Sequence, residues 1–189
     1  MTEMTFAEAI EAALAQAMAA DQRVVVFGED APGLRMNLYA RFGEERVRST
    51  PISEAAFVGA AVGAAMAGLR PVVEVMLVDF VTVAADALVN HAAKVAAFSG
   101  GDWQVPLVVR AACGGGYGDG GQHEQALWGM LAGIPGLLLL ARFSPWGVRE
   151  PSFTVEPPRH LEPLSAAALA LRASLAGGLA FPSNAPVSR

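Results

Sequence analysis

The sequence predicts an α/β fold in which a parallel sheet carries helices on both faces. Short runs rich in Val and Leu alternate with helical stretches along the first 140 residues, an order typical of parallel βαβ units. The runs are apolar throughout rather than alternating, as expected for strands buried on both faces. With 189 residues, the chain is long enough for one substantial domain and a short additional segment.

The expected elements follow one another in a regular order. An opening helix should run to about residue 20 from a capping box formed by Thr5 and Glu8. A strand at 23–27 follows, and then a loop that contains Gly and Pro. Further strands are expected at 71–77, 106–109 and 136–140, and further helices at about 54–68, 81–98 and 123–134.

The helix expected at 54–68 is apolar on every side. Its centre, 59–68, consists almost entirely of Gly, Ala, Val and Met, and a helix of this kind is buried all round. Two alternatives explain the small residues: internal packing against the sheet, or contact with another subunit. Only 16% of the residues are charged, below the ~25% typical of soluble domains, so we expect a partner chain to cover part of the surface.

The character of the chain changes after Arg142. Seven of the 12 prolines lie in residues 143–189, where only 164–176 has the composition of a modest helix. We therefore divide the chain into an α/β domain at 1–142 and a divergent Pro-rich tail at 143–189.

Composition argues against several functional classes. A net charge of −5 without a basic cluster argues against nucleic acid as a ligand. The single cysteine cannot form an internal disulfide, and the three histidines lack the spacing of a metal site; these residues are Cys113, His91, His123 and His160. No secretory signal is visible, and the longest uncharged apolar run, 55–69, is shorter than the ~20 residues of a membrane span. We expect a cytoplasmic protein without a membrane segment.

The glycine-rich segment 116–121 matches the dinucleotide-binding pattern G-x-G-x-x-G between a strand and a helix. That reading also needs an acidic residue after the next strand, where the sequence has Leu140-Ala141-Arg142. A flexible loop is the better interpretation, and a small dinucleotide-binding module is kept as an alternative. Gly118-Asp119-Gly120 also matches the start of a diphosphate-binding motif. That motif ends in an Asn some way downstream, and the next Asn here is Asn184, so we regard the match as accidental.

Three side chains are candidates for a functional site. Glu54 stands at the entry to the apolar helix, where the helix terminus favours a carboxylate and apolar neighbours disfavour it; it is otherwise a first-turn acid that complements the helix dipole. His123 follows the glycine loop and is either a reactive imidazole or a structural histidine. Phe80 at a strand end offers a face to a flat ring or packs in the core.

Taken together, five segments occur in the order and spacing of one family: 27–30, 50–54, 58–74, 89–94, and Gln122-His123 ahead of 134–137. Over about residues 3–140, the chain resembles the β-subunit of the thiamine-diphosphate-dependent 2-oxoacid dehydrogenase component. This group includes the pyruvate, branched-chain and acetoin enzymes. The long segment 58–74 makes the likeness far more specific than any short motif.

The resemblance implies a pyrimidine-binding domain of the transketolase type. In that family the glutamate matched by Glu54 contacts the pyrimidine ring of thiamine diphosphate and favours its imino tautomer. Phe80 matches an aromatic residue that lines the pyrimidine pocket, and Ile52 and Met76 match neighbouring pocket positions. His123 falls on an active-site histidine associated with substrate and acyl transfer. The implied reaction is oxidative decarboxylation of a 2-oxo acid, with transfer of the acyl group to a lipoyl arm.

The resemblance also implies partners. Family members act with an α-subunit that holds the diphosphate and its magnesium ion, and their β-subunits pair in a heterotetramer that engages a lipoyl acyltransferase core. The segment between Asp30 and Phe42 is shorter than in the usual relatives, and the likeness to the family fades near Ala141, so we expect the family's second domain to be absent. The alternative is therefore a truncated, catalytically silent remnant that only binds partner subunits.

Overall fold

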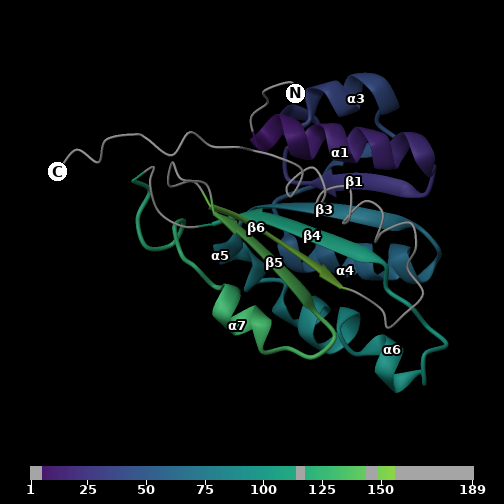
Figure 1. Ribbon diagram of the computed structural model, residues 1–189, viewed down its shortest axis with the longest axis vertical. Helices are drawn as coiled ribbons and strands as arrows, with labels where there is room; N and C mark the ends of the chain where they lie inside the picture. The colour runs from purple at the N-terminus through teal and green to yellow at the C-terminus, as the bar shows by residue number, and fades with distance from the viewer. Residues whose placement is uncertain (1–5, 114–117, 144–148, 156–189) are drawn as a thin grey trace, which may run out of the picture.

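Six strands form one sheet with the order β2-β1-β3-β4-β6-β5 in the computed structural model of the chain (Figure 1). The structure describes residues 6–113, 118–143 and 149–155. Strands β2, β1, β3 and β4 are parallel neighbours, whereas β6 is antiparallel to both β4 and β5. The strands are β1 (Val24–Gly28), β2 (Val47–Ser49), β3 (Arg70–Leu77), β4 (Leu107–Ala112), β5 (Leu138–Phe143) and β6 (Arg149–Val155).

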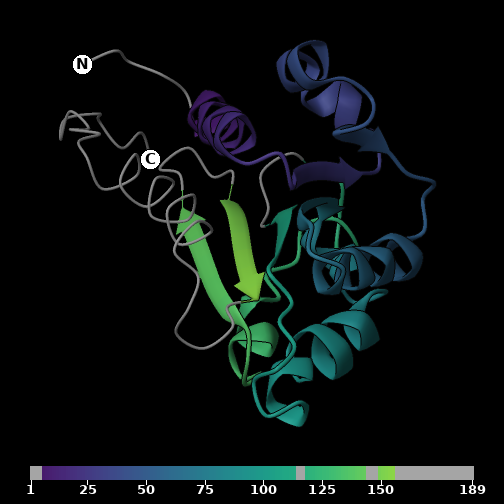
Figure 2. The ribbon, with the colours of Figure 1, turned by 90° about the vertical axis from the view of Figure 1, so that its right-hand side faces the viewer.

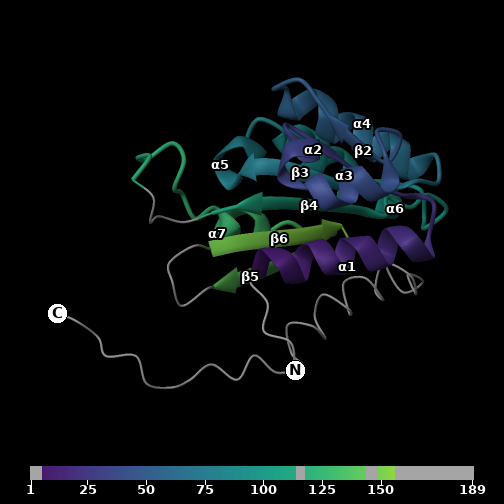
Figure 3. The same ribbon diagram turned by 90° about the horizontal axis from the view of Figure 1, so that it is seen from above.

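Helices cover both faces of the sheet, as the sequence predicts. Helices α1 (Phe6–Ala20) and α3 (Met36–Phe42) pack on one face, and α4 (Glu54–Met66), a π-helix η1 (Ala87–Ala92) and α7 (Trp128–Ala132) pack on the other. Alternate strand residues separate the two cores: Val72 lies in the cluster under α1, and Val73 and Val75 lie in the cluster under α4. Figures 2 and 3 show α1 and α4 on opposite sides of the strands. The predicted α/β fold is confirmed.

The segment after β1 differs from the expected loop. It contains helix α2 (Ala31–Leu34), helix α3 and the edge strand β2. Pro32 lies in the first turn of α2, where proline is tolerated because the missing N–H has no partner in a helix start. The prediction of a plain loop was wrong because Pro and Gly were taken as breaks rather than as the start of a short helix.

The single helix expected at 81–98 is divided into three. Helix α5 (Val78–Val81) follows β3 directly, and the π-helix η1 and helix α6 (Val95–Phe98) come after a turn. The hydroxyl of Thr82 donates a hydrogen bond of 2.7 Å to the carbonyl oxygen of Asp79, a local bond of the kind that competes with helix propagation. The helix expected at 123–134 is likewise reduced to α7, and the capping residue Thr5 lies outside the described residues.

Strand β6 comes from the Pro-rich segment. It pairs with β4 on one side and with β5 on the other, so the strand expected at 136–140 is not a direct neighbour of β4. The sheet therefore extends past residue 142, where the sequence placed the end of the domain. The helix suggested at 164–176 falls outside the described residues.

Helix α4 is buried on one face only in the isolated chain. Its buried residues face the sheet: Glu54, Phe57, Val58, Ala61, Val62 and Ala65. Ala55, Ala60 and Gly63 on the opposite face are exposed. The expectation of burial on every side is therefore wrong for the chain by itself, and the small residues face outward.

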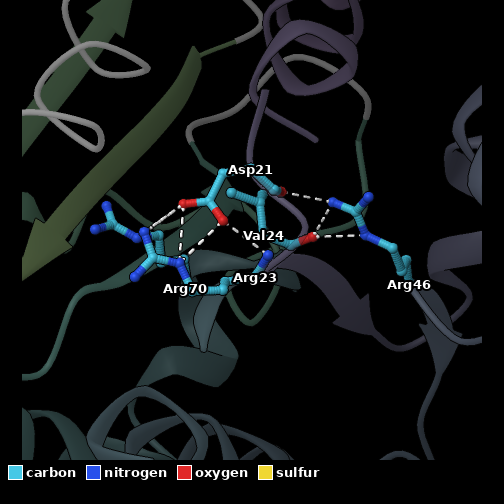
Figure 4. Close-up of polar contacts among 5 residues, drawn as sticks. All are labelled: Asp21, Arg23, Val24, Arg46 and Arg70. Atoms are coloured by element: carbon cyan, nitrogen blue, oxygen red, sulfur yellow. Dashed lines mark hydrogen bonds and ion pairs between the residues drawn. The ribbon is translucent and has the colours of Figure 1, made fainter. Parts of the chain in front are cut away.

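The N-terminal ends of β1 and β3 are joined by an ion cluster (Figure 4). Asp21 accepts hydrogen bonds from Arg23 Nε at 3.0 Å and Arg23 Nη2 at 2.8 Å, and Arg70 Nε lies 3.2 Å from its carboxylate. Arg46 donates to the carbonyl oxygens of Asp21 and Val24. The hydrogen bonds from Arg23 lower the pKa of Asp21 from 3.8 to about 2.

No helix in the described ranges is long and apolar enough to cross a membrane.

Candidate functional site

The candidate residues are carried by the C-terminal ends of the parallel strands. Glu54 follows β2, Phe80 follows β3, and His123 follows β4. Because β1 to β4 run in the same direction, these three connections leave the sheet at the same end, where the parallel strands finish. Ligands of open α/β sheets bind outside the carboxyl ends of the strands. The ion cluster around Asp21 lies at the opposite end, where strands β1 and β3 begin.

Glu54 is a buried carboxylate at the start of α4. The residue is 7% exposed and is the first residue of the helix, after Ser53 at the N-cap. Within the part of the chain that the structure describes, Glu54 makes no hydrogen bond or ion pair. The Glu54 oxygens are not among the fully buried side-chain atoms that lack a partner, so they remain accessible as acceptors that a bound ligand can fill.

Phe80 and His123 are in direct contact. Their ring centroids are 5.4 Å apart with an interplanar angle of 86°, the edge-to-face arrangement favoured by aromatic rings. Phe80 is partly buried against the cluster that contains Phe57, one turn after Glu54. The side chain of His123 is 36% exposed, with Nδ1 4.0 Å from Asp119. The imidazole is therefore supported by an aromatic ring and still accessible to a ligand.

The loop before His123 is held by a side chain of its own. Glu124 Oε1 accepts the backbone N–H of Gly118 at 2.6 Å and that of Asp119 at 3.2 Å. Gly118 and Gly120 have φ of 85° and 83°, conformations that only glycine adopts without cost. The dinucleotide pattern at 116–121 begins outside the described residues, and helix α7 starts at Trp128 rather than in the loop. The loop thus differs from a dinucleotide-binding turn, which opens directly into a helix.

The two weaker pocket candidates are apolar and exposed. Ile52 is 75% exposed just before α4, and Met76 is 36% exposed near the end of β3. The register between β3 and β4 shifts between Val75 and Leu77, an irregularity of the kind that redirects side chains next to active sites. A role of Ile52 and Met76 in a pocket stays a prediction.

A buried ion network near the same edge was missed by sequence reasoning. Glu74 on β3 is contacted through Oε1 by Arg35 Nε at 3.0 Å and through Oε2 by Arg110 Nη1 from the neighbouring strand β4. All three residues are less than 9% exposed. A Cβ at Gly28 would lie 2.0 Å from the carbonyl oxygen of Glu74, so β1 approaches β3 too closely here for any other residue. The sequence signal that could have revealed this network is the presence of Glu74 and Arg110 in otherwise apolar strands, because charged residues are almost never buried unless they are paired.

No group of three potential metal ligands occurs among the residues that the structure describes. The groups that the structure brings to the candidate site are a buried carboxylate, an aromatic ring and an imidazole. This set can bind an organic ligand and move protons.

Comparison with known proteins identifies the family of the chain. Residues 2–156 match the family described as "Transketolase, pyrimidine binding domain", so the chain belongs to that family. The end of the match agrees with the end of β6 at Val155. The predicted family resemblance is confirmed.

Within that family, the chain is similar to β-subunits of 2-oxoacid dehydrogenases. It is 37% identical over 155 residues to the 2-oxoisovalerate dehydrogenase subunit beta of Bacillus subtilis, covering 79% of this chain and 47% of that protein. It is 43% identical over 148 residues to a mitochondrial pyruvate dehydrogenase E1 component subunit beta-1 of Arabidopsis thaliana, covering 75% and 41%. The beta subunit of acetoin:2,6-dichlorophenolindophenol oxidoreductase of B. subtilis is 35% identical over 164 residues, covering 77% and 48%. The chain thus spans less than half the length of these relatives.

Proposed function

We propose that this chain is the pyrimidine-binding part of the β-subunit of a 2-oxoacid dehydrogenase component. The component decarboxylates a small 2-oxo acid with thiamine diphosphate and transfers the acyl group to a lipoyl arm. The main support from the structure is Glu54, a 7% exposed carboxylate without a partner in the described chain. The similarity to the beta subunits above supports the reaction class.

The residues present fit the pyrimidine end of this cofactor. The Glu54 carboxylate would hold a proton shared with a ring nitrogen, in a position where water is largely excluded. Phe80 would form an apolar wall for the ring, with Ile52 and Met76 as neighbours. When bound, thiamine diphosphate supplies the carbon nucleophile and the electron sink of the reaction. His123 would donate or accept a proton at the substrate during acyl transfer.

The proposal includes an α-subunit that holds the diphosphate and a magnesium ion. The exposed face of α4 around Ala60 and Gly63 suits contact with another subunit, including a β–β contact in a heterotetramer. Docking on a lipoyl acyltransferase core is proposed for the assembled complex. The composition favours the cytoplasm, whereas the Arabidopsis relative is mitochondrial by name.

Co-expression with a candidate α-subunit tests this function. We expect the two chains to purify together and, with a lipoylated acceptor domain present, to release carbon dioxide from pyruvate or a branched-chain 2-oxo acid only when thiamine diphosphate and Mg²⁺ are added. A panel of these acids, together with acetoin followed by release of acetaldehyde rather than carbon dioxide, would identify the substrate. Association without turnover would instead assign the chain to the alternative, a remnant that only binds partner subunits.

A further inference from the structure

Asp79 is a buried acid that the proposed reaction does not use. It is the residue before Phe80 in α5 and is 5% exposed. Its Oδ1 accepts a hydrogen bond of 2.7 Å from Gln125 Nε2. Its Oδ2 is buried without a hydrogen-bond partner among the described residues. This carboxylate is therefore held in the protein interior while using one oxygen to bind a side chain 46 residues away.

Two adjacent contacts join the same two segments. Asp79 precedes Phe80 by one residue, and Gln125 follows His123 by two. The hydrogen bond between Asp79 and Gln125 thus lies beside the ring contact between Phe80 and His123. One contact is polar and directional, and the other is a weak aromatic contact whose geometry depends on where the backbone holds the rings.

The two segments differ in how firmly they are held. The neighbours of Asp79 in α5 are core residues: Val78 and Val81 are 0% and 1% exposed. Residues 118–122 of the loop before His123 are exposed, and the Glu124 bonds to Gly118 and Asp119 lie within the loop itself. Asp79 is therefore the fixed end of the pair, and Gln125 is one point at which the loop is attached to it.

We propose that Asp79 is a positioning residue that acts through Gln125 to hold the imidazole of His123 against the ring of Phe80. The catalytic consequence rests on the proposed function, because His123 is the group that would act at the substrate. Neither Asp79 nor Gln125 needs to touch the reacting atoms. The hydrogen bond from Gln125 and the ring contact of Phe80 with His123 together join the loop to α5.

The position of His123 can be measured on the chain alone by NMR. The protein has only three histidines, so the ring C–H signals of His123 are identified by their loss in His123→Ala. Phe80→Leu removes the ring current and shows where these signals lie without the aromatic contact. We expect Gln125→Ala to shift the His123 signals toward the Phe80→Leu positions.

Matched variants separate this effect from a general disturbance of the loop. Gln122→Ala removes the same side chain from an exposed position in the same segment and should leave the His123 signals unchanged. Asp79→Asn keeps an oxygen that accepts from Gln125 and should retain most of the wild-type shift. Gln125 is exposed, so its removal tests the proposal even if Asp79→Ala does not fold.

The second measurement uses the complex with the α-subunit. Displacement of a reacting group by about 1 Å costs up to ~100-fold in rate, so we expect Gln125→Ala to lower kcat for acyl transfer by about 10- to 100-fold with KM for the 2-oxo acid unchanged. Unshifted His123 signals in Gln125→Ala would overturn the positioning role whatever the activity. A wild-type complex without turnover would refute the proposed function, while the NMR result would still decide whether Asp79 and Gln125 position His123.

Discussion

Buried acids at the C-terminal edge of the sheet differ in what surrounds them. Glu74 is contacted by two arginines, and Asp79 accepts a hydrogen bond from Gln125. Glu54 alone of these three has no partner in the described part of the chain. Because no contact within the described chain depends on the Glu54 carboxylate, we expect its removal to affect ligand chemistry far more than stability.

Glu54→Gln tests this difference, since it keeps the shape of the side chain and removes its charge and basicity. We expect turnover of the complex to fall by roughly 10²- to 10⁴-fold, the usual contribution of a proton-transferring side chain. Carbon dioxide release measures the effect, and the melting temperature should change little. Glu45→Gln alters an exposed acid and serves as the control. Full turnover of Glu54→Gln would remove Glu54 from the site.

Glu74→Gln should have the opposite profile. The substitution withdraws the carboxylate that Arg35 and Arg110 contact in the interior, and removing one partner of a buried ion network costs about 3–5 kcal/mol. Urea denaturation of the isolated chain should show this loss of unfolding free energy. A loss below 1 kcal/mol would show that the network contributes little to stability.

Helices and strands were predictable to the extent that local pattern determines them. The runs at β1, β3 and β4 are rich in β-branched residues and buried on both faces, and their positions are confirmed within one to three residues. Strand β6 contains Pro151 and exists through pairing with β4 and β5, so long-range contacts rather than local pattern define it. Local composition also could not reveal the break after α5.

The candidate site was predictable only in part. Glu54 stands out because it is a lone acid at the start of an apolar helix, and its burial is confirmed. The contact between Phe80 and His123 depends on two strand ends meeting at one edge, which spacing along the chain does not encode. Asp79 was missed by sequence reasoning, because its partner Gln125 lies 46 residues away.

The stability that the ion cluster at the N-terminal ends of β1 and β3 contributes depends on pH through Asp21. Its pKa is lowered from 3.8 to about 2 in the folded chain, so the folded state binds a proton less readily than the unfolded state. The resulting stabilisation is fully present above pH 4 and is lost as the pH falls toward 2. We expect Asp21→Asn to lower the unfolding free energy at pH 7 by about 1 kcal/mol.

The pH profile provides the check on Asp21. The difference in unfolding free energy between wild type and Asp21→Asn should shrink steadily between about pH 4 and pH 2, as followed by urea denaturation at each pH. A constant difference across this range would show that the Asp21 carboxylate does not carry the effect. Asp119→Asn, at an exposed acid on the other edge of the sheet, is a suitable comparison.

The proposed assembly with other subunits would use surfaces that the isolated chain leaves open. The exposed face of α4 has small residues such as Ala55, Ala60 and Gly63, which permit close approach of another backbone. The same helix begins with Glu54, so a subunit bound along α4 would also lie near the candidate site. Association and catalysis are therefore expected to depend on one helix through different residues.

Ala60→Arg separates these two roles. Position 60 is exposed in the isolated chain and Arg is a good helix former, so the substitution should leave the melting temperature of the chain nearly unchanged. A long charged side chain on a closely packed face should abolish binding of the partner subunit, as measured by co-purification and light scattering. Ala40→Arg makes the same change at an exposed position of α3 on the other face and should bind normally. Equal binding by both variants would place the subunit contact away from α4, because a closely packed interface cannot accommodate a buried, unpaired guanidinium.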